Sequence, residues 1–266
     1  MMTNETGSSN KGRTGECHVC GQNKLLSFEH IPPQSVGNRH KVLVYSGEEA
    51  IEAGSFGTGN VGGLKYRQQQ RGLGFQTLCR DCNSYLGNHY VRPFDKFLLA
   101  SVYGIRNPDR HLIAIDHEHR LCQMTASSLQ ALAFSKQVVS NFCTVTTPGG
   151  MSDCRDYLLN CEDNRFPERY RLHMYLLPDL TGPSIFSDWI TVIYKDRQYL
   201  TFAVVAFPPF GFILCDLDYS DAIPDKAGDV TDLTRTRWSD AVSAQFTLPV
   251  IEGDLARRPF FWIQER

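Results

Sequence analysis

The sequence lacks a long apolar run. No segment of its 266 residues approaches the roughly 18 consecutive apolar residues that a helix needs to cross a bilayer, which argues against an integral membrane protein. Residues 1–15 are rich in Ser, Thr, Asn and Gly and contain no apolar segment, which argues against a secretory signal peptide. We expect them to form a disordered tail. The sequence also has no internal repeat, which argues against a solenoid or array.

The cysteines do not form the even set that a disulfide framework requires. There are nine, and the odd count, the chain length and the missing signal segment argue against a secreted, disulfide-linked protein. We therefore expect a reducing, cytoplasmic location. Four cysteines fall into two CxxC pairs. The other five are expected to be small, buried apolar residues: Cys122, Cys143, Cys154, Cys161 and Cys215.

A glycine-rich stretch is present, but a phosphate-binding motif is missing. Residues 54–63 contain five glycines, yet they lead into Leu64-Lys65-Tyr66 and not into the GK[ST] sequence of a phosphate-binding loop. This excludes a nucleotide-binding P-loop. Two interpretations stay open, namely a mobile flap that carries Lys65, Arg67 and Arg71 to a site, or a disordered insertion.

The net charge of −2 conceals an uneven distribution along the chain. Residues 1–110 hold 13 Lys and Arg against 9 Asp and Glu, which gives +4, and the remaining 14 Lys and Arg against 20 Asp and Glu give −6. A basic excess in the first part favours a polyanionic partner such as nucleic acid. Ordinary solvated surface charge is the alternative explanation.

Periodicity predicts an α+β fold with a mainly antiparallel sheet. In the first part, Pro93 should kink or restart the helix that follows the second CxxC pair, because proline has no N–H to donate, and Gly104 should end it. The other elements expected there are strands at 25–28, 42–45 and 75–78 and helical segments at 85–90 and 94–103.

The second part begins after a boundary near Asn107-Pro108-Asp109. A hairpin that turns at residues 116–119 should be followed by an amphipathic helix over 129–142 and a shorter helix over 152–160. Closely spaced strand-like runs come next, and short connections favour antiparallel pairing. These runs are 170–177, 189–194, 199–207 and 211–217, with edge strands at 246–251 and 260–263.

Two CxxC pairs predict a metal site. Cys17-x-x-Cys20 and Cys79-x-x-Cys82 supply four thiolates, the full tetrahedral ligand set of a structural zinc. Gly21, after the first pair, provides left-handed backbone for a tight turn. Four buried free thiols are the alternative, which this spacing disfavours. A zinc here would draw the flanking segments together and place Glu29-His30 near Asn83.

Two other groups of metal-capable residues do not meet the requirements of a metal site. Asp116-His117-Glu118-His119 falls on the expected hairpin, where alternate residues face opposite ways, so we expect no metal there. Asp216, Asp218 and Asp221 lack the glycine and terminal Glu of a calcium loop, and we expect them to be solvated.

Four motifs within about residues 17–100 carry a resemblance to a known family. They are Cys17-x-x-Cys20-Gly21, Glu29-His30-Ile31-Pro32-Pro33, Leu78-Cys79-x-x-Cys82-Asn83 and Gly87. This set resembles the zinc-stapled, two-CxxC branch of the HNH endonucleases. The resemblance implies a ββα-metal (HNH) module with a structural zinc over residues 16–106, followed by an α+β domain of unknown role over residues 107–266.

The resemblance also implies an activity. The family hydrolyses nucleic-acid phosphodiester bonds with one divalent metal, here Mg²⁺ or Mn²⁺. His30 matches the family's general base, Glu29 matches its acidic metal ligand, where Asp is more usual, and Asn83 contributes to the metal site. Nucleic acid, DNA in preference to RNA, is the expected partner. The residues expected to contact it are Lys65, Arg67, Arg71 and Arg80.

Two family positions are not matched. Many members carry an Asn that orients the catalytic His, and that position corresponds here to Gly74. Gln76, Asn60 or a backbone carbonyl are the possible replacements. The third catalytic position, on the helix, is open between His89 and Asn88.

The C-terminal part resembles an uncharacterised extension of some bacterial HNH proteins. The resemblance lies in Arg169-Tyr170-Arg171 and Phe207-Pro208-Pro209-Phe210-Gly211. Because some such proteins occur among phage-defence genes, anti-phage defence is one implication. Two other classes stay open: a non-catalytic zinc-knuckle module that binds nucleic acid or protein, and a nuclease subunit silent until a partner or ligand engages the acidic half. That half is also where a protein partner or a second copy is expected to bind.

Overall fold

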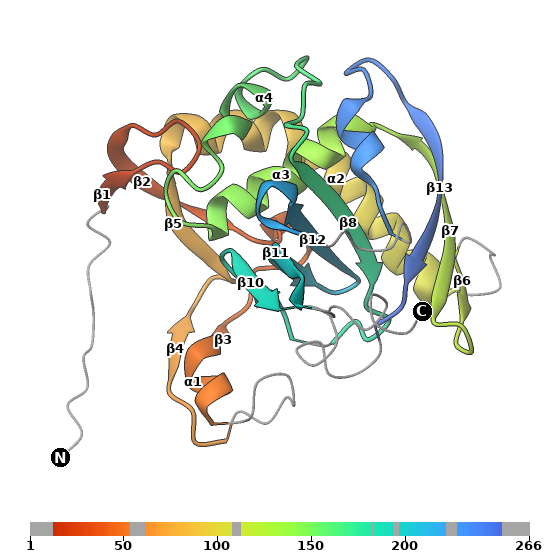
Figure 1. The fold of residues 1–266 in the computed structure, drawn as a ribbon, viewed down its shortest axis with the longest axis horizontal. Helices are drawn as coiled ribbons and strands as arrows, with labels where there is room; N and C mark the ends of the chain where they lie inside the picture. The colour runs from red at the N-terminus through yellow and green to blue at the C-terminus, as the bar shows by residue number, and fades with distance from the viewer. Residues whose placement is uncertain are drawn as a thin grey trace.

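The computed structural model describes residues 13–53, 62–107, 113–181, 183–193, 197–221 and 228–251. The protein is an α+β structure with mostly antiparallel sheets, as predicted (Figure 1). Among the described helices, none is both long enough and apolar enough to span a membrane.

The first sheet has three antiparallel strands in the order β1-β2-β5. These are β1 (Thr14–Glu16), β2 (Asn23–His30) and β5 (Gly74–Cys79). The strands predicted at 25–28 and 75–78 are therefore confirmed. Strand β1 includes Thr14 and Gly15, so the prediction of a disordered tail over residues 1–15 is wrong for these two residues. Residues 1–12 lie outside the described part.

A single long helix, α2 (Arg80–Arg106), follows β5 directly. It runs through Pro93 without a break and past Gly104, so the predicted restart and the predicted end are wrong, while a kink at Pro93 stays a prediction. Packing outweighs the missing proline hydrogen bond, because Tyr90 and Phe94 on either side of the proline are fully buried. The helix starts beside the first sheet and ends against a different sheet (Figure 1).

Residues 31–73, here called the insertion, connect β2 to β5. They form η1 (Gln34–Val36), β3 (Val42–Tyr45), α1 (Gly47–Glu52) and β4 (Tyr66–Gln69). Among the described strands, β3 and β4 pair only with each other, and they project with α1 from the body of the protein (Figure 1). The predicted strand at 42–45 is confirmed, whereas most of the glycine-rich stretch, residues 54–61, lies outside the described residues.

The second part contains two further antiparallel sheets. One has the order β13-β7-β6, built from β6 (Ile113–Asp116), β7 (Leu121–Leu129) and β13 (Val242–Pro249). The other has the order β10-β11-β12-β8, with the short β9 also pairing with β11. Its strands are β8 (Tyr170–Leu176), β9 (Ile185–Phe186), β10 (Ile190–Ile193), β11 (Tyr199–Phe207) and β12 (Phe210–Asp216). The predicted hairpin and strand runs are thus confirmed, while 260–263 lies outside the described residues.

Helix α3 (Ala131–Val145) lies at the centre of the protein. We predicted an amphipathic helix, but every residue except Val145 is buried, because α2, β11 and η6 (Thr231–Arg235) surround it. The shorter helix predicted at 152–160 is present as η3 (Ser152–Cys154) and α4 (Arg155–Leu159). A final 3-10 turn, η5 (Leu217–Tyr219), follows β12.

One hydrophobic core joins the two predicted parts of the chain. Phe94 of α2 stacks on Phe134 of α3 at 5.7 Å between ring centroids, and Phe97 stacks on Phe210 of β12 at 5.2 Å. The predicted division between residues 106 and 107 stays a prediction, but the two sides of it pack as one unit.

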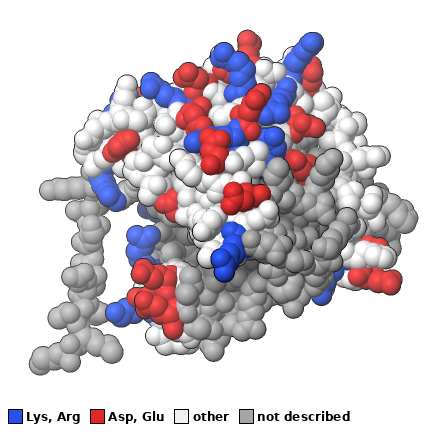
Figure 2. Space-filling model, viewed as in Figure 1, with Lys and Arg blue, Asp and Glu red and all other residues white. Residues whose placement is uncertain are grey.

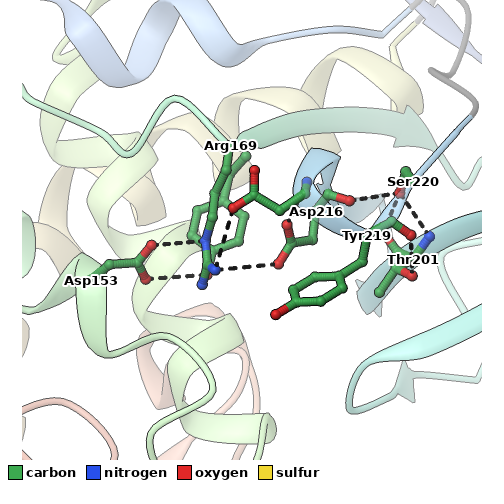
Figure 3. Close-up of polar contacts among 8 residues, drawn as sticks. Asp153, Arg169, Thr201, Asp216, Tyr219 and Ser220 are labelled. Atoms are coloured by element: carbon green, nitrogen blue, oxygen red, sulfur yellow. Dashed lines mark hydrogen bonds and ion pairs between the residues drawn. The ribbon is translucent and has the colours of Figure 1, made fainter.

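An arginine links three segments of the second part (Figure 3). Arg169 Nε lies 2.9 Å from Asp153 Oδ2, and its Nη1 lies 3.9 Å from Asp216 and 3.8 Å from Asp218. Its guanidinium also stacks on the Tyr170 ring at 4.6 Å. Asp216 is only 4 % exposed, so our prediction that it is solvated is wrong. Burial beside Arg169 explains the difference, because a cation offsets the cost of burying a carboxylate.

Candidate metal centre and the adjacent His30 site

Two tight turns bring the four cysteines together. Cys17 and Cys20 lie in the turn between β1 and β2, while Cys79 ends β5 and Cys82 lies in the first turn of α2. In the first turn, the Gly21 N–H donates to the Cys17 carbonyl at 2.8 Å, and Gly21 has a φ of 71°, which favours glycine. All four side chains are buried, and their sulfurs lie within 4.8 Å of one another.

The four-cysteine group fits a tetrahedral metal. A zinc with Zn–S bonds of about 2.3 Å requires sulfurs about 3.8 Å apart, and the Sγ atoms of Cys20 and Cys79 are 3.9 Å apart. The Cys79 N–H donates to Cys17 Sγ at 3.2 Å, and a hydrogen bond from the Cys82 thiol is the main cause that lowers the pKa of Cys17 to about 4. The group could therefore hold a structural metal such as zinc.

The end of β2 lies very close to the start of β5. His30 pairs with Gly74 and Glu29 with Phe75, after a register shift between Ser27 and Glu29. A Cβ atom on residue 74 would lie only 2.1 Å from the Glu29 carbonyl oxygen, so this position requires glycine. This close approach explains why position 74, which we aligned with the His-orienting Asn of the family, is a glycine.

Glu29 and Asn83 lie side by side at this junction. The Asn83 amide donates to Ser27 Oγ at 3.0 Å and to the Phe28 carbonyl at 3.2 Å, which anchors the first turn of α2 to β2. Burial raises the pKa of the Glu29 carboxyl to about 7, although its hydrogen bond with Asn83 acts in the opposite direction. A carboxylate and an amide oxygen at one point are ligands that hard divalent cations prefer.

The His30 ring is held by the insertion. Its Nε2 lies 3.0 Å from the Arg71 carbonyl oxygen and 2.9 Å from the Gln34 side-chain amide, and the Phe28 ring packs edge-on at 4.8 Å. The Arg71 carbonyl oxygen only accepts and the Gln34 amide nitrogen only donates, so a hydrogen on Nε2 suits the first contact and a lone pair on Nε2 suits the second. Burial lowers the pKa of His30, so the ring is neutral at physiological pH.

The structure distinguishes among the alternatives for the missing orienting residue. Within the described residues, Gln76 makes no hydrogen bond to His30, and Asn60 lies outside them. The backbone carbonyl of Arg71 and the side chain of Gln34 occupy this place. Sequence reasoning missed Gln34, although its position four residues after His30 and just past a Pro-Pro turn marked it as a neighbour.

His89, a candidate for the third catalytic position, lies elsewhere on α2. It is six residues after Asn83, which places it about 120° around the helix. Its Nδ1 donates to the Tyr85 carbonyl at 2.8 Å and its ring stacks on Tyr85 at 4.2 Å, with Trp238 at 6.5 Å. The described contacts therefore do not bring His89 to Glu29 and Asn83, and the alternative Asn88 is exposed.

The predicted nucleic-acid contacts are all exposed. We call Lys65, Arg67 and Arg71 the insertion cations, and Arg80 starts α2 directly after Cys79. The Gln69 amide exchanges hydrogen bonds of 3.0 and 3.1 Å with the Gly74 backbone, which fastens β4 beside the junction. Acidic residues lie on the insertion too, on α1. On the face shown in Figure 2, the two signs of charge are interspersed and not separated.

The other candidate cluster has no metal-site geometry. His119 Nδ1 lies 2.9 Å from Asp116 Oδ2 at the exposed hairpin turn. Over the described part of the chain, the four cysteines are the only group of His, Cys, Asp and Glu side chains that converges on a possible ion.

Comparison of the chain with protein-family models, curated proteins and solved structures gives no match. The function therefore has to be argued from the residues themselves.

Proposed function

We propose that this protein is a metal-dependent endonuclease of the HNH type that hydrolyses nucleic-acid phosphodiester bonds. The observation that carries the proposal is that Glu29, whose carboxyl is hydrogen-bonded to Asn83, directly precedes His30 where β2 ends, next to the four-cysteine group. These residues come from one strand, β2, and one helix, α2, which the cysteines hold together, as the family resemblance implies.

The chemistry assigned to each residue follows from its surroundings. The neutral His30 ring is the base that takes a proton from the attacking water. Glu29 and Asn83 would hold one Mg²⁺ or Mn²⁺, which offsets charge on the phosphate when bound. The insertion cations and Arg80 contact the nucleic-acid backbone, which adds affinity without reading sequence.

The four-cysteine group has a separate role in this proposal. It binds zinc, which joins the turn before β2 to the start of α2 and thereby fixes the position of Asn83. Four thiolates leave no open coordination position, so this metal binds no substrate. DNA is the proposed substrate in preference to RNA, and anti-phage defence in bacteria is the proposed setting.

The test is incubation of the purified protein with plasmid DNA and Mg²⁺ or Mn²⁺. We expect metal-dependent nicking by the parent, loss of nicking in His30→Ala, and unchanged nicking in His40→Ala, an exposed histidine of the same insertion. Nicking that survives in His30→Ala would contradict the proposal. A zinc-loaded parent that binds DNA but never cuts it would instead favour the non-catalytic zinc-knuckle module.

A further inference from the structure

The second half of α2 and the strands β6 and β7 form the walls of a pocket. These elements contact one another at the end of α2 that lies away from the first sheet (Figure 1). The pocket begins at Pro93, about 16 Å further along the helix than Cys82 at 1.5 Å per residue. Its volume is about 560 Å³, and small-molecule sites typically occupy about 300–1,000 Å³.

The inner wall of the pocket is apolar. It includes four side chains that are buried in the protein and keep 5–7 % of their surface exposed, namely Phe97, Ile113, Met124 and Leu129. They come from α2, β6 and β7, so three elements contribute to one surface. An apolar ligand body gains free energy when it leaves water for such a wall.

The polar residues of the pocket favour a negatively charged ligand. Among the described residues that line it, Lys96 is the only charged one, and it is exposed. No described carboxylate forms an ion pair with it. The exposed hydroxyls of Thr125, Ser127 and Ser128 lie on the same rim and can donate hydrogen bonds. An anion would therefore meet a cation and donors, and no acidic side chain of the lining.

The start of α3 adds positive charge beside this rim. Gln130, directly before α3, lines the pocket, and no side chain caps the helix, whose first residues Ala131 and Leu132 are buried. The N-terminus of a helix carries a partial positive charge. Ser128 has a φ of 55°, in the left-handed region that residues with side chains seldom adopt, and such conformations are frequent at ligand sites.

We propose that this pocket binds a small organic acid, with the apolar body of the acid against Phe97, Met124 and Leu129 and its anionic group toward Lys96 and the hydroxyls of β7. The pocket lies apart from Glu29 and the four cysteines, so the inference does not rest on the proposed function. A neutral apolar molecule, or an apolar segment of a partner protein, would have no use for the lysine.

Calorimetric titration with decanoate and with 1-naphthoate, each below its micelle concentration, tests the site. We expect the zinc-loaded parent to bind at least one of these acids with a Kd below about 1 mM. Decylammonium, which matches decanoate in chain length but carries the opposite charge, should bind at least about fivefold more weakly. Lys96→Gln should weaken binding of the acid by about two- to fivefold. Lys41→Gln, at an exposed lysine before β3, should leave it unchanged.

A second pair of variants tests where the acid binds. Ala100 is exposed and lines the pocket, so Ala100→Trp places a large side chain in it without replacing a core residue. We expect this change to lower the affinity at least about tenfold, because the ligand and the indole compete for the same space. Leu99→Trp is the control, since Leu99 is 55 % exposed on the same helix and lies outside the lining.

A photoreactive diazirine analogue of decanoate gives a further measurement on the parent alone. After irradiation and digestion, we expect the labelled peptides to include residues 93–101 or 124–130. Labels confined to other peptides overturn the inference. So do failure of both acids to bind, equal binding of decanoate and decylammonium, and parent-like affinity in folded Ala100→Trp. None of these measurements involves DNA cleavage, so absence of nuclease activity would contradict the proposed function and leave this inference standing.

Discussion

Protons should compete with the catalytic metal at Glu29. Burial raises the pKa of this carboxyl to about 7, so about half of the carboxyls are protonated at pH 7 and about nine in ten at pH 6. The metal has to displace that proton, so its affinity falls as the pH drops below 7 and levels off above it. From pH 8 to pH 6, we expect the affinity for Mn²⁺ to fall by about tenfold.

Calorimetric titration of zinc-loaded protein with Mn²⁺ at pH 6, 7 and 8 measures this effect. Glu29→Gln should weaken binding at every pH and remove the pH dependence, because no proton competes at an amide. Asn83→Ala should weaken binding and keep the dependence. His30→Ala should keep both the affinity and the dependence. Equal affinity of the parent at pH 6 and pH 8 would refute the competition, and parent-like Mn²⁺ binding by Glu29→Gln and Asn83→Ala would refute the ligand assignment.

Three further predictions address zinc, substrate and stability. Elemental analysis should find one zinc in the parent, and Cys79→Ser with Cys82→Ser should remove it and make the protein poorly soluble. Replacing all three insertion cations by Ala in the His30→Ala background should lower the affinity for DNA. It should also make the slope of log affinity against log salt concentration shallower by about 2–3 units. An unchanged slope would mean that the insertion cations face away from the substrate. Arg169→Met should lower the free energy of unfolding by about 3 kcal/mol, because it leaves the buried Asp216 unpaired. Lys24→Met, which removes an ion pair with Asp81 in which both side chains are exposed, should leave thermal stability close to the parent's.

The features that the sequence predicted well are those set by local chemistry. The CxxC pairs predicted the converging cysteines, because each pair needs only one tight turn. Strands β11 and β12 were predicted because each is a mainly apolar run ended by turn residues, such as Pro208-Pro209 between them. In both cases a few neighbouring residues determine the structure.

The errors arise where distant segments decide the outcome. Helix α3 has the polar residues of an exposed face, yet Lys136 is fully buried and donates to the Tyr157 and Asn160 carbonyls, with its ammonium 4.3 Å from the Tyr157 ring. Those partners lie on a segment about 20 residues later in the chain. The helical pattern placed the stem of Lys136 among the residues available to a core, but it could not reveal the partners of the buried ammonium, nor that α2 would continue past Pro93.

The surroundings of His30 explain why its ring is oriented by a different residue from the one that the family resemblance implies. Gly74 has no room for a side chain, because a Cβ there would lie 2.5 Å from the Phe28 ring as well as against the Glu29 backbone. An orienting Asn at that position would force β2 and β5 apart and separate Glu29 from Asn83. Under the proposed function, orientation of the base therefore has to come from the insertion. The Arg71 carbonyl and the Gln34 side chain, which both contact His30 Nε2, meet that need without adding any atom between the strands.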